Sequence, residues 1–194
     1  MADPDLIIHI NGWPGCGKLT IGRELAKRLG ARLLDNHTIL NPAEALFDRG
    51  DPLNHSLRKA LRSTILAHAA QMKPGTPLIL TDALSDDAFD AAVFDEYRTL
   101  AAARSATLVA VVLDCSPERN AERLVAGDRA ARHKLTDPMV LASLRAKYRL
   151  LGAPGPPLVE LDVTDLAPEA AAAILAERCR SVLELGRGNA KQAP

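Results

Sequence analysis

The sequence predicts a three-layer α/β fold, in which a five-stranded parallel sheet carries helices on both faces. Two observations predict it. Short apolar, β-branched runs alternate with longer segments whose apolar residues recur about four positions apart. Glycine or proline stands near many of the changes between them. At 194 residues the chain can bury one sizeable core but is short for two ordinary domains. We expect residues 1–185 to form this single domain, and residues 186–194, which lack an apolar face, to be a flexible tail.

The first unit of the alternation is a strand, a glycine-rich turn and a helix. Residues 6–10, LIIHI, form the nearly continuous apolar run of a strand that is covered on both faces. Ile21, Leu25 and Leu29 then recur four positions apart, and Gly30 follows them. This spacing predicts a helix over residues 18–29 with a glycine at its end.

The later elements continue the alternation. Further strands are predicted at residues 31–35, 77–82, 106–114 and 158–163. Helices are predicted at 55–72, after the third strand to about 103, from 116 to before 127, from 137 to about 151, and in the alanine-rich segment after the fifth strand. A helical turn that begins at Pro42 is expected before residues 55–72. That longer helix is expected to carry an apolar stripe of Leu57, Leu61, Ile65, Ala69 and Met72.

The composition argues against several partners. Lys plus Arg equals Asp plus Glu, 24 each, so no overall field is available to hold nucleic acid or an anionic membrane. The three cysteines, Cys16, Cys115 and Cys179, show no CxxC spacing, which suits a reducing cytoplasm. The first apolar run follows acidic residues and is too short for a signal peptide or a membrane span. We expect a cytoplasmic protein, with both a monomer and a homodimer left open.

The turn after the first strand, GWPGCGKLT at residues 12–20, has the pattern of a phosphate-binding loop. Backbone N–H groups can surround a phosphate only where no side chain intrudes, and Gly12, Gly15 and Gly17 leave that room. The next helix directs its free N–H groups and its positive dipole end at the anion, and Lys18 adds a charge. The alternative is a chance glycine turn, but the position between a strand and a helix favours the nucleotide site.

Leu19 stands where such a loop usually has a serine or threonine that binds magnesium, and a leucine cannot do this. The letters GKLT resemble the GK-x-T form of nucleoside monophosphate kinases, which have a P-loop NTPase fold. The resemblance implies that Thr20 contacts phosphate and helps to hold magnesium. It implies a nucleotide-binding set of Gly12, Gly15, Cys16, Gly17, Lys18, Leu19 and Thr20. The side chains of Cys16 and Trp13 are expected to pack or to face solvent.

Two acids end predicted strands, at the sheet edge where parallel sheets bind ligands. Asp82 ends PLILTD in the position of a Walker B acid and can orient magnesium or its waters. Asp35 ends the second strand and resembles the aspartate that shikimate, gluconate and chloramphenicol kinases place near the acceptor hydroxyl. A carboxylate there could accept the hydroxyl proton. Either acid could instead be a helix cap or a turn residue. His37 could contact the acceptor, although a histidine in a polar loop is more often ordinary.

Residues 119–134 are rich in arginine, and ERLVAGDR within them resembles the entry to the mobile lid of these kinases. The resemblance implies a short lid at about 127–137, with Arg123 and Arg129 beside the nucleotide. It also implies that Arg132 or Arg145 reaches the transferring phosphoryl group, since arginine binds phosphate oxygens bidentately. The alternative for the segment is a solvated basic face.

The acceptor is expected to bind residues 37–73, where Arg49, Arg58 and Arg62 are candidates for an anionic group. A solvated helix face is the equal or better interpretation of these arginines. Over nearly the whole chain, the closest resemblance is to small P-loop kinases of the gluconate kinase, chloramphenicol phosphotransferase and tunicamycin-resistance group.

That resemblance implies an ATP- and Mg²⁺-dependent transfer of the γ-phosphoryl group to a small-molecule hydroxyl or phosphate. A nucleotide-binding sensor or resistance protein without transfer is the alternative. The chain has neither the DxxG nor the NKxD motif of a GTPase, and it has little room for the additional domain of a full AAA motor.

Overall fold

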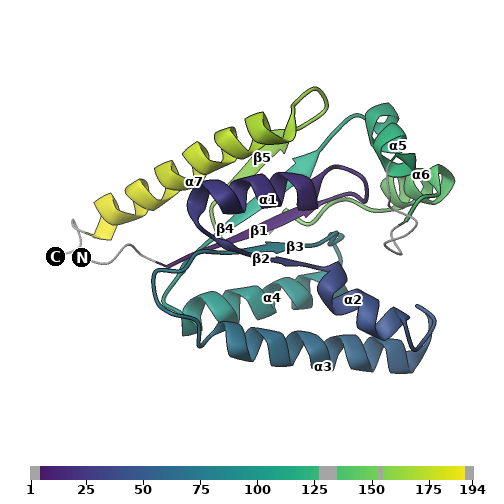
Figure 1. Cartoon of the computed structure of the whole chain (residues 1–194), viewed down its shortest axis with the longest axis horizontal. Helices are drawn as coiled ribbons and strands as arrows, with labels where there is room; N and C mark the ends of the chain where they lie inside the picture. The colour runs from purple at the N-terminus through teal and green to yellow at the C-terminus, as the bar shows by residue number, and fades with distance from the viewer. Residues whose placement is uncertain (1–4, 127–134, 153–154, 191–194) are drawn as a thin grey trace.

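The structure, a computed structural model, describes residues 5–126, 135–152 and 155–190, with side chains described as far as residue 185. Its strands form one sheet in the order β2-β3-β1-β4-β5, and every neighbouring pair is parallel. The strands are β1 (Leu6–Gly12), β2 (Arg32–Asp35), β3 (Leu78–Thr81), β4 (Thr107–Asp114) and β5 (Leu158–Asp162). The predicted α/β fold with a five-stranded parallel sheet is confirmed (Figure 1).

Helices cover both faces of the sheet. One face carries α1 (Lys18–Leu29) and α7 (Pro168–Ala190), which pack against each other. The opposite face carries α3 (Pro52–Ala69) and α4 (Ala88–Ala103) (Figure 1). Each layer has its own apolar core, and β1 is buried along its whole length because it lies between the two layers.

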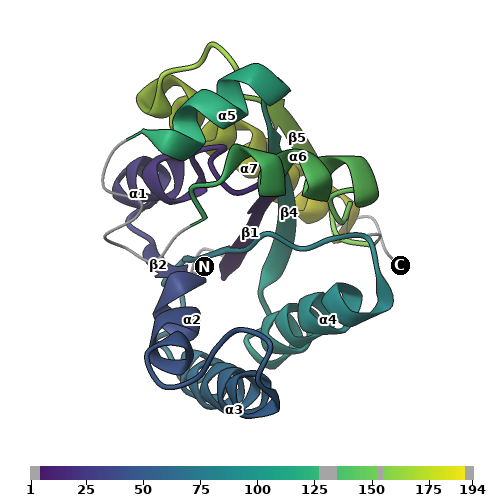
Figure 2. The same cartoon turned by 90° about the vertical axis from the view of Figure 1, so that its right-hand side faces the viewer.

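The remaining helices lie near the carboxyl ends of the strands. They are α2 (His37–Glu44), α5 (Pro117–Val125) and α6 (Pro138–Lys147). Figure 2 looks onto this end of the molecule, with α5 and α6 above and α2 and α3 below. A third apolar cluster, built on Trp13, Leu124 and Leu141, joins α5 and α6 to the loop after β1. The carboxyl edge of the sheet is therefore surrounded by helices from both layers.

The buried face of α3 differs from the predicted apolar stripe. Asn54, Arg62, Leu66 and Ala69 are buried, whereas Leu57, Leu61 and Ile65 are only half-buried. The face that points inward is thus turned by about one residue from the stripe that the leucines predict. The reason is that α3 buries polar side chains toward the carboxyl edge of the sheet. The spacing of apolar residues cannot predict the burial of polar ones.

Two other boundaries differ from the prediction. Pro42 lies inside α2, which begins at His37, instead of starting a turn. The tail predicted from residue 186 is helical in its first part, because α7 continues to Ala190. Adding a residue to an existing helix gains a backbone hydrogen bond without a new nucleation step, which offsets the cost of about 1 kcal/mol for each glycine.

At the amino-terminal end of the sheet, a buried ion pair joins the chain before β1 to the end of α4. Arg104 donates to Asp5 from Nε (3.0 Å) and Nη2 (2.8 Å), and to the carbonyl oxygens of Ala69 and Thr76. Asp5 also accepts a hydrogen bond from the N–H of Gly75. Over the ranges that the structure describes, none of the helices is both long and apolar enough to span a bilayer.

Candidate functional site

The loop between β1 and α1 owes its shape to its glycines. Gly15 and Gly17 have φ values of 91° and 97°, which side chains rarely adopt. A Cβ atom on Gly12 would lie 2.5 Å from the carbonyl oxygen of Leu113 and 2.7 Å from Cys16 Sγ. Gly17 is the N-cap of α1 and offers no side chain to its first turn. The N–H groups of that turn therefore lack a side-chain cap and are available to an anion.

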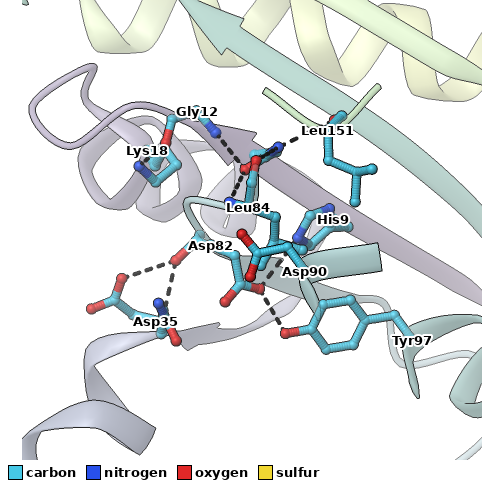
Figure 3. A network of polar contacts seen from close by, with 12 residues as sticks. His9, Gly12, Lys18, Asp35, Asp82, Leu84, Asp90, Tyr97 and Leu151 are labelled. Atoms are coloured by element: carbon cyan, nitrogen blue, oxygen red, sulfur yellow. Dashed lines mark hydrogen bonds and ion pairs between the residues drawn. The ribbon is translucent and has the colours of Figure 1, made fainter. Parts of the chain in front are cut away.

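Lys18 bends back over this loop. Its Nζ donates to the carbonyl oxygen of Gly12 (2.6 Å) (Figure 3). It also donates to the carbonyl oxygen of Trp13 (2.9 Å). The ammonium group is thereby held beside the helix N-terminus, where the dipole also favours negative charge. Such an arrangement suits a phosphate group, which both features attract.

Residues of α5, α6 and the end of β4 hold the glycine loop in place. Cys16 and Trp13 are buried, so their side chains pack within the protein. Asn120 of α5 donates from Nδ2 to the carbonyl oxygen of Pro14 (2.8 Å). Arg145 of α6 donates to Asn120 Oδ1 (3.1 Å) and to Asp114 at the end of β4 (2.9 Å). The structure thus gives Arg145 a part in holding the loop. Its contact with a transferring phosphoryl group, which the resemblance implies, stays a prediction.

The two predicted acids lie at the ends of adjacent strands. Asp35 pairs in register with Thr81, and Asp82 is the next residue of the chain. Thr81 Oγ1 donates to Asp35 Oδ1 (2.9 Å), which orients the Asp35 carboxylate (Figure 3). Both acids line the same cavity as the glycine loop. The topology therefore brings together the residues that the strand-end argument selected.

Asp82 is almost fully buried and is held by two aromatic side chains. Its Oδ2 accepts a hydrogen bond from the Tyr97 hydroxyl (2.6 Å) and lies 3.2 Å from His9 Nε2 (Figure 3). Tyr97 in turn lies 3.3 Å from Nη1 of Arg62. Burial, and then the charge of Asp82, raise the pKa of Tyr97 well above its usual value of 10.0. The phenol consequently stays protonated and remains a donor to Asp82.

An open cavity of about 1440 Å³ connects these groups. Small-molecule sites are usually roughly 300–1,000 Å³, so this one has room for two ligands side by side. The cavity is lined by these predicted site residues: Gly15, Cys16, Gly17, Lys18, Leu19, Thr20, Asp35, His37, Arg58, Arg62, Asp82 and Arg123. Gly12 lies behind them, and its N–H is hydrogen-bonded to Asn11 Oδ1.

Arg58 and Arg62 are not the solvated helix face that the sequence favours. Arg62 is 7% exposed and Arg58 is half-buried, and both line the cavity from α3. Nε of Arg58 is buried without a hydrogen-bond partner. Desolvation, and then the neighbouring charge of Arg62, lower the pKa of Arg58 from its usual value. His37 also lines this part of the cavity, and its Nδ1 lies 3.2 Å from Asn41 Oδ1.

The opposite end of the cavity lies beside α5 and the start of α7. Arg123 donates from Nη2 to the carbonyl oxygens of Val163 (2.9 Å) and Thr164 (3.0 Å). It shares this end with Arg119 and Pro168. The other two predicted lid residues, Arg129 and Arg132, and most of the predicted lid at about 127–137 lie outside the described residues.

The side chains of the cavity fit a magnesium ion that is held largely by nucleotide phosphates and waters. Across the described ranges, no group of three His, Cys, Asp or Glu side chains could hold a metal by itself. Magnesium bound to a nucleotide needs no such group, since one or two carboxylates, waters and phosphates complete its shell. Asp82 lines the cavity, and its contacts with His9 and Tyr97 are both made by Oδ2, so that Oδ1 accepts no hydrogen bond from the described side chains. Thr20 is exposed in the first turn of α1 and lines the same cavity.

Sequence analysis missed several residues that shape this site. Asn11 joins β1 to the chain beyond β3, because its Oδ1 accepts from the N–H of Leu84 and its Nδ2 donates to Leu84 and Leu151. Asp90, in the first turn of α4, accepts from the N–H of Ser85 and lines the cavity. One signal was present: His9 and Asn11 are polar residues within a strand that is otherwise apolar and buried on both faces.

Comparison with known proteins shows a match between this sequence and a protein family. A family model described as an AAA domain matches residues 8–136, about two-thirds of the chain. A 40-residue segment is 48% identical to part of a shikimate kinase from Paracidovorax citrulli. That match spans 21% of this chain and only 22% of the length of that enzyme.

Solved structures share the fold at low sequence identity. One, from Chloroflexus aurantiacus and provisionally described as a kinase, has a TM-score of 0.69 at 20% identity, over 93% of this chain and 99% of its own. A gluconokinase from Sinorhizobium meliloti has a TM-score of 0.61 at 17% identity, over the whole of both chains. These likenesses extend the match of the fold to residues on both sides of the family model.

Proposed function

The chain belongs to the AAA domain family, and from this membership and the geometry of its cavity we propose that it is an ATP-dependent kinase of a small molecule. One observation carries the proposal: Lys18 and the glycine loop share a single cavity with the strand-end acids Asp35 and Asp82. A phosphate cradle, a carboxylate for the cation and a carboxylate for the acceptor are the parts that phosphoryl transfer needs. The shikimate kinase and gluconokinase likenesses agree with this reaction class.

We place the triphosphate against the loop at 12–18, with the nucleoside toward α5. The uncapped N–H groups of α1 and the Lys18 ammonium would bind the phosphates, and the Lys18 contacts with Gly12 and Trp13 keep the ammonium at the loop. Arg123 and Arg119 line the end where the nucleoside would lie. The three free, buried cysteines suit the cytoplasm, where ATP is abundant.

Magnesium would be held by Asp82 and the phosphates, with Thr20 near them. When bound, the ion would neutralise charge that develops on the phosphate oxygens. Asp35 would accept the proton of the acceptor hydroxyl. The hydroxyl oxygen would form a bond to the γ-phosphorus as the bond between that phosphorus and the β-phosphate oxygen breaks, which releases ADP. Thr81 holds the Asp35 carboxylate in one orientation for this step.

We further propose that the acceptor carries an anionic group in addition to its hydroxyl. Arg58 and Arg62 place guanidinium groups in the cavity with few partners of their own. The charges of Glu44 and Asp90 offset only part of the cost of burying the Arg58 guanidinium, because its pKa is still lowered. A carboxylate or phosphate on the acceptor would offset more of that cost. The half of the cavity between α2, α3 and α4 is therefore expected to select acids over neutral sugars.

The experiment is to incubate the protein with [γ-³²P]ATP, Mg²⁺ and matched pairs of acceptors, each a hydroxy acid or sugar phosphate with its neutral analogue. Label is expected on the anionic member, and Lys18→Ala is expected to abolish transfer. Lys27→Ala, an exposed lysine at the other end of α1, serves as the control. ATP binding without transfer to any acceptor or to water would favour the nucleotide-binding sensor in place of the kinase.

A further inference from the structure

A row of buried polar side chains joins Asp82 and Arg62, which line the cavity, to His9 and Tyr97, which the proposed reaction does not use. It consists of His9, Asp82, Tyr97 and Arg62, which are 1%, 2%, 3% and 7% exposed. They come from β1, the end of β3, α4 and α3, so four separate segments meet here. Such convergence of polar groups in a core is costly unless each has partners.

Two of the contacts in this row are made to one oxygen atom, Asp82 Oδ2. Tyr97 donates its hydroxyl proton to Asp82 Oδ2 (2.6 Å), and His9 Nε2 lies 3.2 Å from the same atom. Arg62 supports Tyr97 from the other side, since its Nη1 lies 3.3 Å from the phenol oxygen. Oδ1 of Asp82 receives no hydrogen bond from the described residues, and Asp82 is one of the residues that line the cavity.

The aromatic rings prevent this arrangement from shifting. The His9 ring packs against Phe94 and Tyr97, each with centroids 5.1 Å apart. The rings of Phe94 and Tyr97 are also nearly perpendicular, at 88°. A carboxylate tied at Oδ2 and packed in this way can rotate little, so the direction of Oδ1 is fixed as well.

We propose that Tyr97, together with His9, is a positioning residue that orients Asp82 Oδ1 toward the nucleotide-bound divalent cation. The proposal rests on the proposed function, because it assigns Asp82 to the cation of an ATP complex. Tyr97 acts only through Asp82 and touches neither substrate nor metal. Losing its hydroxyl leaves the carboxylate present but free to rotate, which weakens cation binding without removing the ligand.

The test measures Mn²⁺ affinity by electron paramagnetic resonance, with a non-hydrolysable ATP analogue bound to the protein. Tyr97→Phe is expected to weaken Mn²⁺ binding about tenfold, the usual size of a change behind a metal ligand. The affinity of the analogue without metal should stay the same. Tyr148→Phe is the matched control: it removes the hydroxyl of the chain's other tyrosine, which lies in the third apolar cluster and does not line the cavity.

A double-mutant cycle separates positioning from a general structural effect. Asp82→Asn should weaken Mn²⁺ binding by itself, and adding Tyr97→Phe to it should change little more. Equal losses in both backgrounds, or a loss of metal-free analogue affinity in Tyr97→Phe, would overturn the positioning role. So would unchanged Mn²⁺ affinity in Tyr97→Phe while the wild type binds. A wild type that binds neither analogue nor Mn²⁺ would instead defeat the proposed function, and the positioning role with it.

Discussion

Two groups of buried charges lie at opposite ends of the same sheet, and they are satisfied to different degrees. At the amino-terminal end, Arg104 makes four hydrogen bonds, two of them to Asp5. At the carboxyl end, Arg58 leaves its buried Nε unpaired, and Arg62 donates only to Tyr97 within the described structure. The first group is complete without a ligand and the second is not. Under the proposed function, an anionic acceptor would complete the second group, whereas the first group serves the fold alone.

The largest effect is expected at Arg104, in the group that is complete without a ligand. Arg104→Ala should lower the free energy of unfolding by about 3–5 kcal/mol, because it leaves the Asp5 carboxylate buried without its partner. Urea denaturation followed by circular dichroism measures the change, with the exposed Arg180→Ala on α7 as control. The ATP affinity of the folded fraction should not change. A loss below about 1 kcal/mol would mean that the pair adds little to the fold.

The second largest effect is expected at Lys18, which lines the same cavity as Arg58 and Arg62. Lys18→Ala should weaken ATP binding by at least about a hundredfold, near 2.7 kcal/mol, because it removes the cation that faces the phosphates. The free energy of unfolding should change by only about 1 kcal/mol, since the ligand-free lysine bonds to two carbonyl oxygens of a half-exposed loop. Calorimetric titration with ATP and a urea curve give both values. Loss of binding in parallel with a large loss of stability would erase the contrast with Arg104.

A smaller effect of opposite sign is expected at Arg58. Arg58→Leu should leave stability unchanged or raise it by about 0.5–1 kcal/mol, because a half-buried guanidinium with an unpaired Nε is a cost in the empty protein. Transfer to an anionic acceptor should fall, while hydrolysis of ATP with water as acceptor should persist. Thermal denaturation and the labelled-ATP assay measure these two properties. A clear loss of stability would show that Arg58 belongs with the structural charges.

The sequence predicts the helices and strands that carry these two groups better than it predicts the contacts of their side chains. Helix α1 begins and ends where the apolar spacing and Gly30 indicate, and each strand lies within two residues of its predicted limits. The apolar runs suffice for this because burial in a parallel sheet requires them. Asp35 and Asp82 meet because adjacent parallel strands end at one edge, which the alternation also implies.

The polar core could not be predicted in the same way. Asn54, Arg58, Arg62 and Leu66 are spaced four apart on α3, but three of them are polar and therefore look like a solvated face. Their burial depends on Tyr97 and Asp82 from distant parts of the sequence, so no local pattern reveals it. The buried ion pair of Asp5 and Arg104 was missed for the same reason, since its members are separated by 99 positions.

The smallest effect compares two acids near the carboxyl edge of the sheet, Asp90 at the cavity and Asp162 away from it. Burial, and then the charges of Asp87 and Asp82, raise the pKa of Asp90 above its usual value of 3.8, although the N–H of Ser85 opposes this. Hydrogen bonds from Thr164 instead lower the pKa of Asp162, which ends β5 away from the cavity. A raised pKa means that the stability Asp90 contributes is present below pH 3.8 and is lost as pH rises through its folded value. A lowered pKa means the reverse for Asp162, whose contribution is present above 3.8 and is lost as pH falls.

Asn substitutions at these two positions should therefore give pH profiles of opposite slope. Asp90→Asn should become more stable than the wild type as pH rises from 3 to 7, by a few tenths of a kcal/mol, because water screens this half-exposed group. Asp162→Asn should become less stable than the wild type over the same range. Urea curves at each pH measure both differences. Parallel slopes would mean that Asp90 is paired in the empty protein, and that the carboxyl edge of the sheet is as complete as the base.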